Sequence, residues 1–312
     1  MKKLLLLFLL LQALYTVQAQ EVDVYLIGGQ SNSTGQGRVA NLPQSFTIDK
    51  DVMLFYSKYT NQGENSMQWI SLCPASESKD RFGAELSLGN TLHQYYPDRK
   101  IAIIKHALSG SNLYEQWNPG NLPNEVQGPE YKKFIETIQA GIKDLRNQGY
   151  TPIIKAMFWQ QGEADARELA GEKNNKTYGK NLNNFIRQVR KDIGCENMPF
   201  IFGTVLPLSA ERFPGRTLIK EAQNQVAEAS HTSLSVKGAV LVEADDLQML
   251  YTDYRTPYPK DDVHLGTFGL LTLGERYAKA YQNHLKNSQY KTLSRPSSNY
   301  RHTWRAKHQI VR

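Results

Sequence analysis

A glycine-rich turn places Ser31 between an apolar run and the helix that follows, a position in which a serine can act as a nucleophile. Residues 28–37 read GGQSNSTGQG and follow directly on an apolar, β-branched run. The turn lacks the lysine of a P-loop and the G-x-G-x-x-G spacing of dinucleotide-binding proteins, so it does not predict a nucleotide site. Two interpretations of Ser31 remain. Either its hydroxyl caps the helix that follows, or the glycines expose it as a nucleophile at a helix amino end, where the dipole favours developing negative charge.

A D-x-x-H sequence near the other end of the chain supplies a candidate base. Asp261 and His264 belong to the run DDVHL, which comes just before a helical pattern that starts at about Gly266. The spacing lets one short loop turn the Asp261 carboxylate onto the Nδ1–H of His264 and leaves Nε2 free to take a proton. A lone histidine at a helix start is more often a cap or a surface residue. Together with an exposed Ser31, however, the pair favours a serine nucleophile with a histidine base.

Polar residues also crowd the end of another apolar run, in the segment WQQGEAD at 159–165. The side-chain amide of Gln161 can donate to an oxyanion, and Glu163 or Asp165 can orient a histidine or bind substrate hydroxyls. No histidine or cysteine stands at metal-ligand spacing from these acids, so we predict neither a metal nor another cofactor. In the segment SGSN at 109–112, the N–H of Gly110 can point into the same site.

Alternating apolar and helical stretches predict the scaffold that brings these segments together. Buried β-strands are expected at 22–29, 101–108, 153–160, 199–206 and 238–245. Helical patterns lie between and after them, at 83–97, 128–148, 176–193, 216–231 and 266–285. This alternation predicts an α/β fold, a three-layer α/β/α sandwich with a central parallel sheet. Ligands bind beyond the carboxyl ends of such strands, which is where Ser31, Gly110 and Gln161 stand.

The formal net charge of +7 comes from the ends of the chain. Lys2 and Lys3 precede an apolar run, and the six basic residues after residue 286 have no acidic residue among them. Without these eight, the chain carries 29 basic and 30 acidic residues. A near-neutral body argues against a phosphate-neutralising groove, so we expect no nucleic-acid partner.

The first 19 residues have the three parts of a secretory signal: a basic start, a Leu-rich stretch and a small-residue ending at Ala19. The apolar stretch, from Leu4 to about Val17, is shorter than the roughly 20 residues of a membrane-spanning helix. We therefore expect cleavage after Ala19 and a secreted or periplasmic protein with no membrane span. No linker or repeat divides residues 20–286, which we expect to form one domain, followed by a basic and poorly ordered tail at 287–312.

The composition is that of an ordinary globular protein, with 40% hydrophobic and 21% charged residues. A chain of this size buries a large core without covalent cross-links. Export permits a bridge between Cys73 and Cys195, but two unpaired thiols are the simpler expectation. Nothing in the sequence indicates an oligomeric state.

Taken in order, these residues resemble the sialate O-acetylesterase-like branch of the SGNH (GDSL-type) hydrolases, close to carbohydrate esterase family six. The resemblance spans roughly residues 22–284. It rests on blocks in the family's order: GGQSN around Ser31, RFGAELSLG at 81–89, LSGSNLYEQW at 108–117, WQQGEAD at 159–165 and DDVHLGTFGLLTLG at 261–274. Ordered blocks at the expected strand ends are far more specific than any one of them.

The resemblance implies a carbohydrate O-acetylesterase that acts on an acetylated carbohydrate. Ser31 is then the nucleophile, His264 its base and Asp261 the acid that orients His264. In some relatives the acid of the QGE block has this last role, so Glu163 competes with Asp261.

The resemblance also implies three oxyanion donors: the N–H groups of Ser31 and Gly110 and the side chain of Gln161. We further expect three polar side chains in these blocks to bind substrate: Gln30, Asn32 and Asp165.

The sequence leaves the sugar open between acetylated sialic acid and acetylated xylan or another glycan. A sialic acid site needs an arginine for the carboxylate, and Arg38, Arg81 and Arg167 stand near the motif blocks. Tyr114 and Trp117 are able to stack on a sugar face, although a core position is more usual for Trp117. A catalytically weak glycan-binding protein on the same scaffold is the alternative from a different class, and the intact Ser-His-Asp set weighs against it.

Overall fold

The computed structural model describes residues 19–57, 66–167, 171–205 and 207–293. Of the expected signal peptide, all but Ala19 lies outside the described residues, as does the basic tail beyond residue 293. The predicted start of that tail, residue 287, falls inside helix α7 (Thr267–Leu293). In the part of the chain that is described, no helix is both long and apolar enough to cross a membrane. No disulfide joins Cys73 to Cys195.

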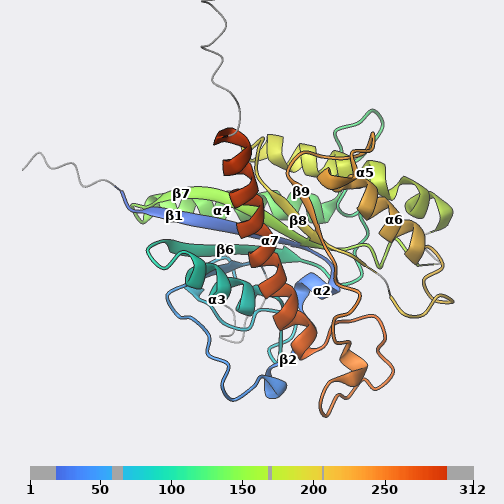
Figure 1. The fold of residues 1–312 in the computed structure, drawn as a ribbon, viewed down its shortest axis with the longest axis horizontal. Coiled ribbons are helices and arrows are strands. Elements are labelled where there is room, and N and C mark those ends of the chain that lie inside the picture. The colour runs from blue at the N-terminus through green and yellow to red at the C-terminus, as the bar shows by residue number, and fades with distance from the viewer. Residues whose placement is uncertain (1–18, 58–65, 168–170, 206, 294–312) are drawn as a thin grey trace, which may run out of the picture.

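A seven-stranded sheet forms the middle of the molecule (Figure 1), in the order β4-β3-β6-β1-β7-β8-β9. Its strands are β1 (Glu21–Gly29), β3 (Met53–Tyr56), β4 (Trp69–Ser71), β6 (Lys100–Ala107), β7 (Thr151–Gln160), β8 (Phe200–Gly203) and β9 (Ala239–Val242). Neighbouring strands are parallel except for β3 and β4, which pair antiparallel. A separate antiparallel pair joins β2 (Gly37–Arg38) to β5 (Arg81–Phe82).

The sequence of β1 explains its central place in the sheet. Every residue from Val22 to Gly29 is buried. The parallel register sets Leu26 opposite Ile104 of β6 on one side and Met157 of β7 on the other. A nearly continuous apolar run of this kind is stable where helices cover the sheet on both faces.

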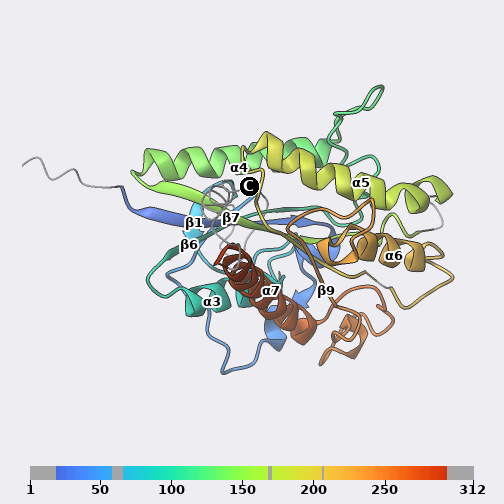
Figure 2. The same ribbon diagram turned by 45° about the horizontal axis from the view of Figure 1, so that its top comes forward.

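Helices cover the two faces as separate layers (Figure 2). On one face α3 (Glu85–Tyr95) packs against α7. On the other lie α4 (Pro129–Asn147) and α5 (Gly171–Asp192), with α6 (Arg216–Val226) packed against α5. The predicted three-layer α/β/α sandwich is therefore confirmed.

The core consists of two apolar clusters, one on each face of the sheet. The cluster under α4 and α5 contains Trp117, Phe134 and Phe185, and the rings of Phe134 and Phe185 meet Trp117 edge to face. The cluster under α3 and α7 contains Tyr25 and Leu270. Trp117 is fully buried, so its predicted place in the core is confirmed.

Each predicted strand and helix is present. The ends agree within five residues except at α7, which runs eight residues past its predicted end at 285. The sequence pattern missed β3 and β4 and the β2–β5 pair. These strands have two to four residues, too few to show an alternation of apolar and polar side chains. It also did not define the four-residue helix α2 (Ser31–Thr34), which follows β1.

A buried ion pair supports the segment that carries Ser31. Lys105 on β6 and Glu85 in the first turn of α3 are 2.7 Å apart, and both side chains are fully buried. The Lys105 ammonium also donates to the carbonyl oxygens of Thr34, at 2.9 Å, and Ala75, at 2.7 Å. Burial lowers the pKa of Lys105, and the Glu85 carboxylate opposes that shift. Because Thr34 ends α2, this cation holds the helix that begins at Ser31.

Replacing Lys105 by methionine should lower the free energy of unfolding by about 3 to 5 kcal/mol, because the Glu85 carboxylate would stay buried without its counter-charge. The double variant Lys105→Met/Glu85→Gln should recover part of this loss, since it removes the charge but keeps an oxygen that accepts the N–H of Ala75. Unfolding in guanidinium chloride measures both values. A double variant no more stable than Lys105→Met would show that the stranded charge is not the cause.

Candidate active site

The turn after β1 depends on the absence of a side chain at Gly29. Its φ is +135°, and a Cβ at this position would lie 2.1 Å from the carbonyl oxygen of Gln160. The close approach lets the N–H of Gln30 donate to the same oxygen at 3.0 Å. Helix α2 begins at the next residue, so Ser31 stands directly beyond the carboxyl end of β1. Gln30 occupies the N-cap position, and the capping interpretation of Ser31 is therefore wrong.

Ser31, His264 and Asp261 form one hydrogen-bonded chain. The Ser31 hydroxyl lies 2.9 Å from Nε2 of His264, and Nδ1 of His264 lies 2.7 Å from Oδ2 of Asp261. The other Asp261 oxygen accepts the backbone N–H groups of His264 and Val263, at 3.1 and 3.2 Å. Asp261 thus holds Nδ1 protonated, which leaves Nε2 as the acceptor that faces Ser31.

Opposing effects act on the Asp261 carboxyl. Burial alone would raise its pKa. The hydrogen bond and charge of His264, together with the two backbone N–H groups, outweigh burial and lower the pKa below its usual value. Asp261 is therefore ionised at neutral pH and able to stabilise a protonated His264.

Glu163, the competing acid, does not contact the imidazole. Its Oε1 accepts the side-chain N–H of Asn32 at 2.5 Å, and its carboxyl is almost completely buried. Burial raises the pKa of Glu163, while its own backbone N–H, Asn32 and the charge of His264 oppose that shift. By geometry, Asp261 is the acid that orients His264.

The Gln161 side chain is buried, makes its hydrogen bonds inside the protein, and does not line the cavity over Ser31. Its amide N–H₂ lies within hydrogen-bonding distance of Asp165, Ser111 O and Gln30 Oε1, at 2.6, 3.1 and 3.2 Å. Asp165 also accepts the backbone N–H of Leu113 at 2.8 Å. An amide with buried partners for both hydrogens has none left for an oxyanion, so the expectation for Gln161 does not match the structure.

The residues expected to bind substrate differ in their positions. Gln30 lines the cavity, but its side-chain oxygen accepts the N–H of Ala164 at 3.0 Å. Asn32 and Asp165 are 4% and 0% exposed and do not line the cavity. Their polar atoms bind neighbouring loops instead, because buried polar groups need partners inside the protein.

Two backbone N–H groups remain as candidate oxyanion donors, those of Ser31 and Gly110. Both residues line the cavity. Within the described part of the chain, neither N–H has a protein acceptor. Gly110 has a φ of +73°, a conformation that favours glycine and exposes the peptide at the tip of the turn after β6.

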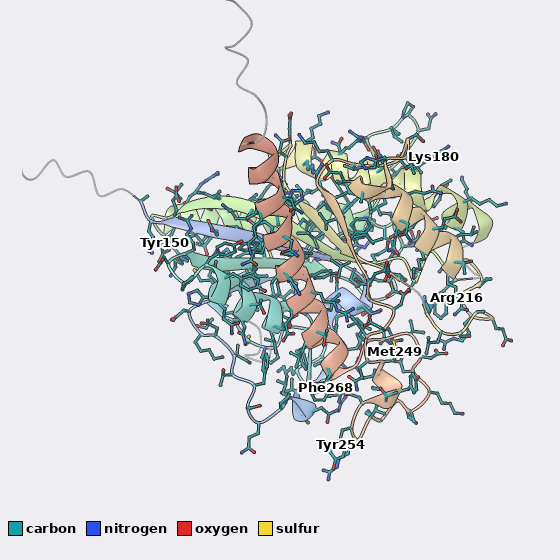
Figure 3. The ribbon with its side chains drawn as sticks, viewed as in Figure 1. Tyr150, Lys180, Arg216, Met249, Tyr254 and Phe268 are labelled. Atoms are coloured by element: carbon teal, nitrogen blue, oxygen red, sulfur yellow. The ribbon has the colours of Figure 1, made fainter. Side chains whose placement is uncertain are left out.

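A cavity of about 600 Å³ opens over Ser31 and His264. It lies at the carboxyl end of the sheet. Met249, labelled in Figure 3, lies at this end and forms a β-bridge with Leu265, the neighbour of His264. Tyr150, also labelled there, lies at the opposite end, just before β7.

Three cations line this cavity: Arg167, Arg212 and Lys260. The guanidinium carbons of Arg167 and Arg212 lie 5.7 and 5.3 Å from the centre of the Phe213 ring. Arg212 is paired with Asp262 at 3.1 Å. Among the residues described, no carboxylate pairs with Arg167 or Lys260.

The sequence pointed to one of these cations, Arg167. Arg38 pairs with Asp80 at 2.8 Å, and neither Arg38 nor Arg81 lines the cavity. Arg212 and Phe213 belong to no motif block. Their position in the loop after β8, at the carboxyl end of the sheet, is the signal that could have identified them.

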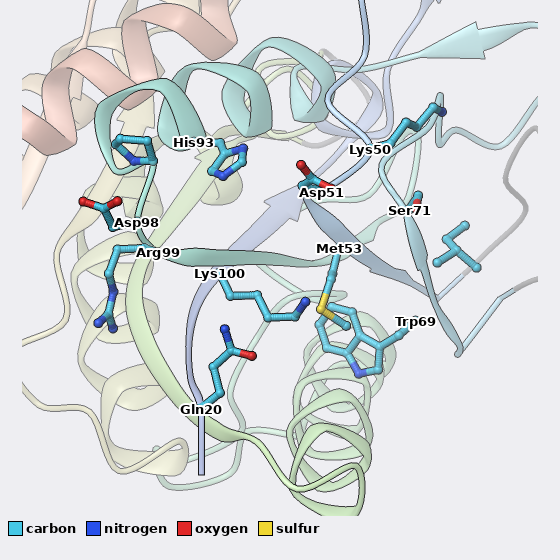
Figure 4. Close-up of a pocket in the computed structure, with 12 residues that line it drawn as sticks. Gln20, Lys50, Asp51, Met53, Trp69, Ser71, His93, Asp98, Arg99 and Lys100 are labelled. Carbon is cyan, nitrogen blue, oxygen red and sulfur yellow. The ribbon is translucent and has the colours of Figure 1, made fainter. Parts of the chain in front are cut away.

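A second cavity, of about 500 Å³, lies at the opposite end of the sheet (Figure 4). Gln20, Met53 and Lys100, at the amino ends of β1, β3 and β6, line it. Its histidine, His93, is hydrogen-bonded to Asp49 at 2.6 Å. The lining residues therefore do not offer a serine with a free base.

Comparison with known proteins finds a family match over most of the chain. The family model described as carbohydrate esterase, sialic acid-specific acetylesterase, matches residues 21–283. A probable carbohydrate esterase of Arabidopsis thaliana is 28% identical over 272 residues, which cover 83% of this chain and 90% of that protein.

Solved structures share the fold at lower identity. The Arabidopsis thaliana protein has a TM-score of 0.61 at 18% identity, and the match covers 85% of this chain and 98% of that one. NanS has a TM-score of 0.62 at 14% identity, over 87% of this chain and 100% of its own. A carbohydrate acetylesterase of Xanthomonas citri has a TM-score of 0.56 at 18% identity, over 85% of this chain and 56% of its own.

The role of Asp165 as a buried support has a consequence for stability. Burial raises the pKa of Asp165 to about 6, against the hydrogen bonds from Leu113, Gln161 and Tyr114 that lower it. Its contribution to folding is therefore fully present below about pH 4 and is lost as the pH rises through about 6.

We expect the stability advantage of wild type over Asp165→Asn to shrink by about 3 kcal/mol between pH 4 and pH 7. Urea unfolding of both proteins across this range measures the difference, in which the contributions of all other groups largely cancel. A difference that does not change with pH would contradict the raised pKa of Asp165.

Proposed function

Because the chain belongs to the carbohydrate esterase family of the sialic acid-specific acetylesterases, we propose that it removes acetyl groups from acetylated sugars with Ser31, His264 and Asp261 as its catalytic triad. One observation carries the proposal. The Ser31 hydroxyl and the Asp261 carboxylate bind opposite nitrogens of His264, at 2.9 and 2.7 Å, at a cavity large enough for a sugar.

In the first half of the reaction, the Ser31 oxygen attacks the acetyl carbonyl carbon while Nε2 of His264 takes the hydroxyl proton. The carbonyl oxygen becomes an oxyanion, which the N–H groups of Ser31 and Gly110 stabilise. The tetrahedral intermediate then collapses, and the C–O bond to the sugar breaks. His264 returns the proton to the departing sugar oxygen, and Ser31 carries the acetyl group.

In the second half, water attacks the acetyl-enzyme. His264 takes a proton from the water, and a second tetrahedral intermediate forms at the same donors. Collapse breaks the bond to Ser31, the proton returns to the serine oxygen, and acetate leaves. Asp261 keeps its negative charge throughout and stabilises the imidazolium in both halves.

The charge of the cavity favours an acidic sugar. Arg167 and Lys260 have no carboxylate partner among the described residues. Of the carboxyl groups that line the cavity, Asp261 binds His264, and one oxygen of Glu163 binds Asn32. A guanidinium binds a carboxylate with two parallel hydrogen bonds. This supports an O-acetylated sialic acid as substrate over acetylated xylan, which is neutral. A location outside the cytoplasm, as the leader-like first 19 residues predict, is consistent with a glycan substrate.

Ser31→Ala should reduce acetate release from 4-nitrophenyl acetate to the background rate while the protein keeps its thermal unfolding midpoint. Asp261→Asn should lower kcat/KM by about 10³- to 10⁴-fold, because His264 would lose its orienting acceptor. Rates on 4-nitrophenyl acetate and octanoate, compared for each variant, test the acyl preference as well. Wild-type rates in Ser31→Ala would remove Ser31 as the nucleophile, and rates that rise from acetate to octanoate would argue for a lipase.

Arg167→Ala should lower kcat/KM on O-acetylated sialic acid by about 10- to 100-fold, the value of one charged hydrogen bond. The same variant should keep the wild-type rate on acetylated xylo-oligosaccharides. Arg38→Ala is the matched control, since Arg38 pairs with Asp80 outside the cavity. Equal losses on both sugars in Arg167→Ala would show that the arginine does not select for charge.

A further inference from the structure

The side chain of Asn32 connects the nucleophile to the loop that carries the base. Asn32 follows Ser31 directly. Its Oδ1 accepts the backbone N–H of Leu265 at 2.8 Å, and its Nδ2 donates to the carbonyl oxygen of Val263 at 3.2 Å. Val263 and Leu265 are the two neighbours of His264, so a single amide holds the loop on both sides of the catalytic base.

Glu163 fixes the orientation of this amide. Its Oε1 accepts the remaining N–H of Asn32 at 2.5 Å, which leaves the amide with one acceptor for each hydrogen and a donor for its oxygen. An amide satisfied in this way cannot rotate by 180° without losing all three hydrogen bonds. The hydrogen bonds of Asn32 therefore join three segments: those after β1 and β7 and the loop before α7.

The second oxygen of Glu163 is unusual. Glu163 is 2% exposed, and among the described residues its Oε2 has no hydrogen-bond partner. A buried carboxyl group with an unsatisfied oxygen costs stability. Its Oε1 accepts from Asn32, so orienting that amide is the role that offsets this cost.

We propose that Asn32 and Glu163 are positioning residues: Asn32 holds His264 at hydrogen-bonding distance from Ser31, and Glu163 holds Asn32 in the orientation that does so. This rests on the proposed function, because it assumes that Ser31 and His264 carry out the reaction. It replaces the expected roles of Asn32 in substrate binding and of Glu163 as the partner of His264. Asn32 does not line the cavity, and the Oε1 of Glu163 is bound to Asn32.

Asn32→Ala should lower kcat by about 100-fold, the cost of a displacement of about 1 Å between reacting groups. KM for an acetylated sugar should stay within about threefold, because Asn32 does not touch substrate. Asn183→Ala is the matched control: it removes one asparagine hydrogen bond to a backbone carbonyl, that of Leu234 at 2.7 Å, away from the cavity. This control should keep wild-type kcat.

Glu163→Ala removes the acceptor that orients Asn32 and should lower kcat by about 10-fold, the value of about one hydrogen bond. Glu163→Gln keeps an oxygen for Asn32 and should retain most of the wild-type kcat. Glu130→Ala removes a carboxylate that faces a different histidine, His106, at 3.0 Å. This control should keep wild-type kcat.

The combination Asn32→Asp/Glu163→Gln lets the two side chains bind each other with donor and acceptor exchanged. It should be more active than Asn32→Asp alone, in which two buried carboxyl groups meet. A role confined to stability would lower the unfolding midpoint of these variants without changing kcat, and that result would overturn the proposal.

Labelling of Ser31 by a fluorophosphonate separates this proposal from the proposed function. The labelling rate depends on the Ser31–His264 pair and needs no sugar. Wild type that is labelled but releases no acetate from sugars would refute the proposed function and leave the positioning test intact. Labelling of Asn32→Ala and Glu163→Ala at the wild-type rate would refute the positioning roles, whatever the natural ester is.

Discussion

The close contact between Gly29 and the carbonyl oxygen of Gln160 is the constraint on which the rest of the site depends. Any Cβ at this position would clash with that oxygen. Because glycine has none, the chain is able to turn at the end of the central strand and start α2 at Ser31. The Lys105–Glu85 pair then holds the other end of that short helix through Thr34. A nucleophile needs a fixed position. Here the backbone turn at Gly29 and a buried ion pair fix the position of Ser31, rather than flexible surface loops.

Much of the polar chemistry around Ser31 is internal to the protein. Gln161 and Asp165 belong to a motif block that suggests contact with substrate, yet their side chains tie the ends of β1, β6 and β7 together. The reason is that loops at the carboxyl ends of parallel strands lie outside the sheet, so their peptide N–H and C=O groups have no hydrogen-bond partners in a neighbouring strand. Buried side-chain amides and carboxylates satisfy those groups and make the cavity wall rigid.

Charge is distributed unevenly over this chain. The body of the protein is close to neutral, since the basic excess lies at the two ends of the sequence. The cavity, in contrast, gathers Arg167, Arg212 and Lys260 beside the triad. Cations gathered in one cavity can bind a small anionic group, whereas a basic surface would bind polyanions without discrimination.

The sequence by itself determined the fold class, the main strands and helices, and the Ser31, Asp261 and His264 positions. Apolar periodicity and a three-residue spacing are local, so a linear reading detects them. Tertiary structure alone decided that Asp261 and not Glu163 orients His264. It also decided that the Gln161 amide is hydrogen-bonded to Asp165 and that Arg212 and Phe213 line the cavity. It also placed the short strands β3 and β4. These outcomes depend on contacts between residues far apart in the sequence, such as that of Asn32 with Glu163, 131 residues apart. A local sequence pattern does not show which buried polar groups the fold brings together.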